Sequence, residues 1–321
     1  MKDVIFRRNN GKPVLDLDFL LKKTMQQTKL LDWEKFSEMQ TKQPLKLVAS
    51  ALKQENSTIF DMASGHFNDL EGLGKCMHAS CLLPGIAGPL MYFHEEGNGQ
   101  VKDNFILKNG IVNNNFEPLA DALIYEPLPF RSAISEGATH VVMLRSRPDG
   151  VDVTGKSSLI ERLVMKRFLL RKNKLSNVYK YMQSQQHKKL YAKQIIELNE
   201  NMNSKRDYND TSSPHIMTIA VPPGSPEVTK LEVERESILN GVRRGFARAY
   251  DALVEDENER GRGTALAKDF FPDLILDYNP LEIESEGSAL DYFLKVKEES
   301  GEKCSVPSSL GKTALEAGLP R

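Results

Sequence analysis

Two apolar runs in the first fifth of the chain predict strands. The run at 44–50 follows a proline, and the run at 58–62 comes soon after it. Both have the length and the apolar content of buried strands, and the residues between them are polar. Residues 14–31, which lie ahead of both runs, predict a short buried helix or turn.

A helical pattern follows at 69–83. Leu70, Leu73 and Met77 recur there at helical spacing. The helix is expected to end near Pro84 and Gly85, because proline lacks an amide hydrogen and clashes with the preceding turn.

A second helix is predicted at 130–137, closed by Gly137, and the apolar run at 140–144 predicts a strand directly after it. A helix that leads by a short turn into a continuous apolar strand is half of a β-α-β unit. This order favours an α/β fold with a mostly parallel sheet covered on both faces.

The second half of the chain is predicted to be mainly helical. Residues 156–198 are helix-rich, 215–221 predict one more strand stopped by a Pro-Pro-Gly turn, and a last helix is expected at 225–253. Beyond Val254 short apolar islands alternate with acidic residues, Gly and Ser, so 255–321 are expected to be a mostly flexible tail. The pattern thus divides the chain into 1–150, 151–254 and 255–321.

Composition adds few constraints on function. The 321 residues carry a formal net charge of −1, so any charge-driven partner must be recognised locally, and no nucleic-acid partner is expected. Cys76, Cys81 and Cys304 form no even disulfide framework and no C-x-x-C ligand pair, which favours a reducing compartment and no metal. No apolar stretch is typical of a signal peptide or a membrane span, so a cytoplasmic or peripheral membrane protein is expected.

Asp121 is the strongest candidate functional residue. Taken alone, it is an aspartate in a turn, and most such residues cap or solvate a loop. Its surroundings, however, run from Leu119-Ala120-Asp121-Ala122-Leu123 through Glu126-Pro127-Leu128-Pro129 into the helix, glycine and strand at 130–144. Upstream lies the block Ala79-Ser80-Cys81-Leu82-Leu83-Pro84-Gly85.

Both blocks, in this order, resemble the C-terminal part of a patatin-like phospholipase domain. The resemblance covers about 11–150, and two segments near Leu190-Tyr191 and 242–246 resemble the C-terminal extension of one branch of that family. It implies a partial three-layer patatin-like domain, followed by the helical extension and the tail. It also implies that Asp121 is the general base of a serine–aspartate dyad that hydrolyses lipid esters without a cofactor.

The chain departs from the family pattern at the nucleophile. No serine has glycines two positions away on both sides; Ser157, for example, has Gly155 before it but Leu159 after it. A glycine-rich oxyanion loop is absent as well, since Gly72-Leu73-Gly74 lies inside the predicted helix. Ala122 stands where the family usually has glycine, and alanine resists the positive φ that glycine allows.

Several histidines, one serine and one cysteine in the same region are more simply interpreted as structural residues. His66, His78, His94 and His140 lie in the same region, but a serine–aspartate dyad needs no histidine, so they are expected in the core or on the surface. Ser80 and Cys81 are conceivable nucleophiles, but they precede a helix-ending Pro-Gly and do not occupy a strand-to-helix elbow, so tight packing is the favoured role.

A basic stretch runs from Lys156 to Lys193. It holds eleven Lys and Arg against the single acid Glu161, interleaved with apolar residues. An amphipathic basic helix of this kind binds an anionic membrane surface. The alternative is a solvated face on a helix that packs against the domain.

Three hypotheses follow. The first is a patatin-like lipid acyl hydrolase whose serine lies upstream of Met1, so that this chain is a truncated gene product and inactive by itself. The second is a pseudoenzyme, a non-catalytic lipid- or membrane-binding module derived from the same fold. The third is a fragment that does not fold alone. Lipid substrate and oligomeric state stay open.

Overall fold

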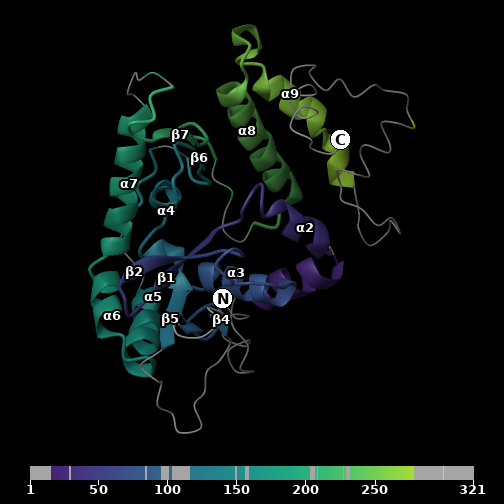
Figure 1. The fold of residues 1–321 in the computed structure, drawn as a ribbon. Helices are drawn as coiled ribbons and strands as arrows, with labels where there is room; N and C mark the ends of the chain where they lie inside the picture. Colours follow the sequence, from purple (N-terminus) through teal and green to yellow (C-terminus); the bar gives the residue numbers. More distant parts are fainter. Residues whose placement is uncertain are drawn as a thin grey trace. The chain divides into compact units, whose positions relative to one another are not determined.

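The structure is a computed structural model that describes residues 16–28, 30–83, 85–94, 101–102, 116–148, 150–155, 159–202, 207, 209–226, 228, 232–277 and 299 (Figure 1). Its elements form two compact units, 1–143 with 152–218 and 144–151 with 219–321. This grouping differs from the ranges 1–150, 151–254 and 255–321, because the chain leaves the first unit after Met143 and returns to it at Asp152.

The first unit contains a five-stranded sheet with the order β2-β1-β5-β3-β4. Its strands are β1 (Leu47–Ala51), β2 (Asn56–Phe60), β3 (Met91–His94), β4 (Val101–Lys102) and β5 (Phe116–Asp121). The predicted strands at 44–50 and 58–62 are therefore confirmed. Every described pairing is antiparallel, with Leu47 opposite Phe60 and Ala49 opposite Asp121.

The expectation of a mostly parallel sheet is wrong for this sheet. Strand β6 (His140–Leu144) follows helix α4 (Phe130–Ser135) as predicted, but it does not return to the sheet that holds β5. Instead β6 pairs with β7 (His215–Ile219) in a separate two-stranded parallel sheet. The sequence pattern of a helix followed by a strand does not indicate which other strand that strand pairs with. The order of α4 and β6 therefore predicted a β-α-β crossover that the structure does not contain.

Helix α3 (Leu70–Cys81) packs against β1, β3 and β5 of the five-stranded sheet. Asp69 caps it by accepting a hydrogen bond from the amide of Gly72, and the helix ends at Cys81 as predicted. The buried side chains of α3 are Leu73, Gly74, Cys76 and Ala79. Both β1 and β5 are buried along nearly their whole length, which is typical of strands covered on both faces.

The remaining helices of the first unit are η1 (Phe19–Thr28), α2 (Trp33–Met39), η2 (Ala122–Ile124), α5 (Leu159–Met165), η3 (Lys166–Lys172), α6 (Ser176–Gln183) and α7 (Gln186–Met202). The helix-rich character of 156–198 is thus confirmed for its described part. Phe168, Leu169, Val178 and Met182 of η3 and α6 join the core of the five-stranded sheet. A second core cluster joins Phe130, Met143, Tyr191, Leu198 and Ile216.

The second unit is built on α8 (Arg235–Leu253) and α9 (Gly263–Phe270), with two short 3-10 helices, η4 (Glu257–Glu259) and η5 (Asp273–Asp277). Helix α8 begins later than the expected 225, after a turn at 222–225 in which Gly224 has a φ of +77°. Residues 255–277 are not the flexible tail that we expected. The carboxylate of Asp251 accepts hydrogen bonds from the amides of Gly261 and Gly263, and Gly263 lies against the backbone of Ala247.

Several predictions fall outside the described residues. They are the start of the resemblance near Gly11, Pro84, Lys156, Ser157, Cys304 and the part of the predicted tail from 278 onward, except Glu299. Within the part of the chain that the structure describes, no helix is both long enough and apolar enough to cross a bilayer.

Candidate functional site

The candidate site lies at one edge of the five-stranded sheet. Strands β2 and β5 both pair with β1 in the antiparallel sense; β2 ends opposite Leu47, the first residue of β1, and β5 ends opposite Ala49, two residues further along. Asp61 directly follows β2 and Asp121 is the last residue of β5, which places the two carboxylates at the same edge. The predicted turn at Asp121 is therefore the end of a central strand.

The backbone of Asp121 is held by hydrogen bonds on both sides. Its amide donates to the carbonyl of Leu82 at 2.9 Å, and its carbonyl accepts from the hydroxyl of Ser50 at 2.9 Å. The same Ser50 hydroxyl accepts a hydrogen bond from the amide of Tyr125 at 3.2 Å. Leu82 belongs to the upstream block 79–85, so the two blocks that carry the family resemblance meet at Asp121.

The carboxylate of Asp121 has fewer partners. Its Oδ1 accepts one hydrogen bond, from the amide of Leu123 at 2.8 Å, which caps η2. Burial raises the pKa of this carboxyl group, and the hydrogen bond from Leu123 only partly offsets that effect. No lysine, arginine or histidine among the described residues forms an ion pair with it.

Alanine at position 122 is compatible with this turn. Ala122 begins the short 3-10 helix η2, and it is not among the residues with a positive φ. The conformation at this position therefore does not require a glycine.

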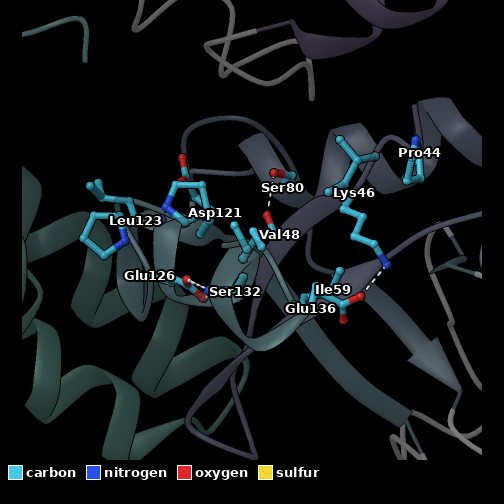
Figure 2. Close-up of a pocket in the computed structure, with 17 residues that line it drawn as sticks. Pro44, Lys46, Val48, Ile59, Ser80, Asp121, Leu123, Glu126, Ser132 and Glu136 are labelled. Atoms are coloured by element: carbon cyan, nitrogen blue, oxygen red, sulfur yellow. Dashed lines mark hydrogen bonds and ion pairs between the residues drawn. The ribbon is translucent and has the colours of Figure 1, made fainter. Parts of the chain in front are cut away.

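Asp121 borders a pocket of about 840 Å³, which lies wholly within the first unit. This volume is in the range that holds a drug-sized ligand. Figure 2 shows the polar residues around it, which are Lys46, Ser80, Asp121, Glu126, Ser132 and Glu136. The other lining residues are apolar or glycine. They are Pro44, Leu47, Val48, Ile59, Ala122, Leu123, Pro127, Pro129, Ala133, Gly137 and Ala138.

Most of the other polar groups in the pocket already have partners. The carboxylate of Glu126 accepts hydrogen bonds from the amide of Ser132 at 2.8 Å and from its hydroxyl at 2.6 Å, and it thereby holds the start of α4. Lys46 forms ion pairs with Asp61 at 2.8 Å and with Glu136 at 2.6 Å. Among the acids that line the pocket, Asp121 therefore has the weakest set of partners: its carboxylate accepts a single hydrogen bond, whereas that of Glu126 accepts two and that of Glu136 pairs with Lys46.

Helix α4 contributes one wall of the pocket and ends as the sequence predicts. Gly137 has a φ of +93°, its amide donates to the carbonyl of Ile134, and the amide of Ala138 donates to the carbonyl of Ala133. This pair of bonds is a Schellman motif, in which glycine takes the left-handed conformation without strain. Gly137 and Ala138 both line the pocket.

Ser80 and Cys81 lie close to Asp121 but are poorly suited to act as nucleophiles. The hydroxyl of Ser80 donates to the carbonyl of Val48 at 2.6 Å, which fastens α3 to β1 (Figure 2). Although Cys81 has an exposed surface, desolvation by its surroundings and then the charge of Asp121 raise the pKa of its thiol, so its thiolate is scarce at neutral pH.

The histidines have structural environments. His66 accepts a hydrogen bond from the amide of Asp61 and packs against Phe60 and Phe93. His78 lies 3.6 Å from Asp18, and His140 stacks on His215. His94 ends β3, and its side chain lies outside the described residues. Across the described ranges, no group of His, Cys, Asp and Glu side chains has a metal-binding arrangement.

Two features of the site were not predicted from the sequence. Strand β5 was not recognised, because Glu117 and Pro118 break its apolar pattern. The pocket itself joins residues from 44–59, 80, 121–127 and 129–138, and no local pattern links these segments. Comparison of the chain with protein-family models, curated proteins and solved structures gives no match, so the functional argument rests on the residues and their geometry.

Proposed function

We propose that the pocket binds the acyl part of a lipid ester and that Asp121 is the general base of a patatin-like serine–aspartate acyl hydrolase. The observation that carries the proposal is a half-buried carboxylate with a raised pKa at the border of a pocket with mainly apolar walls. Perturbed carboxyl groups in apolar pockets are typical of catalytic acids and bases. The order of the two blocks 79–85 and 119–144 in the sequence supports the same conclusion.

The environment of Asp121 suits the removal of a proton from a hydroxyl group. A raised pKa makes the carboxylate a stronger base, and general-base catalysis gains as the pKa of the base approaches the working pH. Within the described residues only the amide of Leu123 binds this carboxylate, through Oδ1. Oδ2 is therefore available to accept a hydrogen bond from a serine hydroxyl.

The nucleophile is assigned to a segment outside these 321 residues, because the chain contains no Gly-x-Ser-x-Gly sequence. In the dyad, the serine oxygen attacks the ester carbonyl while Asp121 accepts the serine proton, and that proton then passes to the leaving alcohol. Water hydrolyses the resulting acyl-serine in the second half of the reaction. The chain as given is thus expected to bind acyl groups without hydrolysing esters.

Binding is tested with the present chain and a fluorescent fatty acid such as cis-parinaric acid. Ala133→Phe places a large ring in the pocket wall and is expected to weaken binding about tenfold. Ser135→Phe is the matched control, because Ser135 is on the same helix but does not line the pocket. Equal affinity of both variants and the wild type would show that the acyl group does not enter this pocket.

Catalysis is tested by reading the coding sequence upstream of Met1. An in-frame Gly-x-Ser-x-Gly codon run predicts that the longer chain hydrolyses a p-nitrophenyl acyl ester and that Asp121→Asn lowers kcat by about 10³ or more. Unchanged turnover in that variant would exclude Asp121 as the base. Turnover by the present chain that disappears with Asp121→Asn would instead place a nucleophile within these residues.

The second candidate function is a non-catalytic lipid-binding module. The hydrogen bond that occupies the Ser80 hydroxyl and the raised pKa of Cys81 favour it, because both leave the pocket without an activated nucleophile of its own. Fatty-acid binding by the present chain, together with a stop codon in place of the serine segment, would select this function.

A further inference from the structure

We propose that α5 and η3 carry a docking surface for an anionic phospholipid bilayer. We define the basic face as Arg162, Leu163, Lys166, Arg167 and Arg171, all of which are exposed. The inference deepens the proposed function, because a bilayer is where a lipid acyl ester would be found. It concerns attachment and not hydrolysis, so the two can fail separately.

The charge of this region is strongly segregated along the chain. From Arg162 to Ile196 the sequence contains ten Lys and Arg and no Asp or Glu, although the whole chain has a net charge of −1. No ion pair to the four cations of the basic face occurs among the described residues. Uncompensated clusters of this kind attract anionic lipid, with about 1 kcal/mol from each cation near the membrane surface.

An apolar side chain lies among these cations. Leu163 is 68% exposed and therefore contributes its side chain to the same surface as the cations. Lys166 and Arg167 follow it by three and four positions, so they lie next to it on the helix surface. A leucine surrounded by long cationic side chains is typical of helices that lie in the membrane interface.

The opposite side of the same helix is fixed to the core. Met165, Phe168 and Leu169 are buried, and η3 packs against α6. The helix therefore has two separate faces, one committed to the core and one that carries the cations.

Gly85 allows the loop after α3 to lie close to α5 and η3. A Cβ atom at Gly85 would lie 2.9 Å from Cγ1 of Val164 and 3.2 Å from Cβ of Phe168, and the φ of +78° also favours glycine. Gly85 is three residues after Leu82, whose carbonyl accepts the Asp121 amide. The loop that holds Asp121 thus also seats the basic helix, so docking would hold the pocket near the bilayer.

A bilayer fits this face better than a nucleic acid does. Single-stranded nucleic acids are bound by exposed aromatic side chains that stack on the bases, combined with cations. Among the described residues of α5 and η3 the aromatic side chain is Phe168, which is 8% exposed and lies under Lys172. The exposed non-polar group of the basic face is an aliphatic leucine, which suits insertion among acyl chains.

The test is co-sedimentation of the 321-residue chain with vesicles of phosphatidylcholine containing about 30% phosphatidylserine. The triple variant Lys166→Gln, Arg167→Gln, Arg171→Gln is expected to lower the partition coefficient about a hundredfold, from about fivefold per cation. Leu163→Ala should lower it by a few-fold, and high salt should weaken wild-type binding. Pure phosphatidylcholine vesicles should bind little protein.

The matched control is Lys35→Gln, Lys42→Gln, Lys268→Gln, which removes the same charge from exposed positions outside the basic face. It should retain most of the binding. Equal losses in both triple variants, equal binding to neutral vesicles, or tighter binding to a single-stranded RNA oligonucleotide than to the anionic vesicles would each overturn the inference.

Fatty-acid binding by the same variants separates this inference from the proposed function. The basic-face variant should bind cis-parinaric acid as the wild type does, which also shows that its pocket is folded. Loss of vesicle binding with retained fatty-acid binding supports the docking surface. Specific vesicle binding without any fatty-acid binding would support the docking surface and reject the acyl pocket.

Discussion

Asp61 and Asp121 lie at the same edge of one sheet, on either side of β1, yet their carboxylates have opposite properties. Burial by itself raises the pKa of both. At Asp61 the hydrogen bonds from Lys46 and Ser64 outweigh burial and lower the pKa to about 2, whereas at Asp121 a single amide does not. The comparison shows that partners, more than burial, decide whether the pKa of an aspartate at this edge is lowered or raised.

Of the substitutions near the two aspartates, removal of the Lys46 ammonium group should change the free energy of unfolding most. Lys46→Met leaves Asp61, whose side chain is 9% exposed, without its charged partner. We expect the free energy of unfolding to fall by about 2.5 kcal/mol, below the loss for a fully buried pair because Lys46 is partly exposed. Urea denaturation measures this loss, and Lys42→Met at an exposed position is the control. Equal stability of the two variants would mean that the pair contributes nothing.

Acid should affect the two aspartates differently. The folded-state pKa of Asp61 is about 2, below the ordinary value of 3.8 for an aspartate, so the stability that this carboxylate contributes is present above pH 4 and is lost as the pH falls toward 2. The loss is about 2 kcal/mol. Unfolding measured between pH 2 and pH 5 should show a shallower slope for Asp61→Asn than for the wild type, and parallel slopes would contradict the assignment.

Loss of the Ser50 hydroxyl should weaken the position of Asp121. This fully buried hydroxyl donates to the carbonyl of Asp121 and accepts from the amide of Tyr125. Ser50→Ala leaves both backbone groups without that partner, and we expect a loss of about 1.5 kcal/mol in the free energy of unfolding. Ser57→Ala, at the position paired with Ser50 across β1 and β2, is the control for a strand serine.

Substitution of Asp121 by asparagine should have the smallest effect, and it should raise the free energy of unfolding. Desolvation raises the pKa of Asp121 in the folded state above its value in the unfolded state. At a pH above the folded-state pKa, the charged carboxylate therefore lowers the free energy of unfolding. At a pH below the unfolded-state pKa, the group is protonated in both states and has no such effect. Asp121→Asn can still accept the hydrogen bond from Leu123, so we expect it to stabilise the protein by less than about 1 kcal/mol at pH 7. The gain should vanish at pH 3. Destabilisation at pH 7, as expected for Asp61→Asn, would show that the two aspartates are alike.

The sequence was informative where local patterns determine local structure. Helix α3 was found from its apolar spacing and the proline after it, and α4 was found from Gly137, because these signals act within a few residues. The pairing of strands depends on distant residues. For that reason β6 was placed in the wrong sheet and the antiparallel order of β1, β2 and β5 was not foreseen.

Strand β5 shows why a polar residue can mislead a prediction. Glu117 is 6% exposed, but its carboxylate accepts a hydrogen bond from the amide of Lys53 at 2.6 Å, in the turn between β1 and β2. Pro118 has no amide to donate, and its carbonyl accepts from Leu52. The partners of both residues lie in the turn that follows β1, which the pattern of β5 does not reveal, so Asp121 could be proposed from its sequence context but not placed in a strand.

The central place of β5 in the order β2-β1-β5-β3-β4 affects how the pocket can open. Amides in a strand flanked on both sides exchange their hydrogens mainly through large-scale unfolding, whereas those of short helices and turns exchange through local opening. The Asp121 amide closes this strand by donating to the carbonyl of Leu82 at the end of α3, so Asp121 is attached to the part of the domain that we expect to exchange slowly. The α4 wall is a short helix closed by Gly137, so we expect it to yield to a large ligand more readily than the strand that carries Asp121.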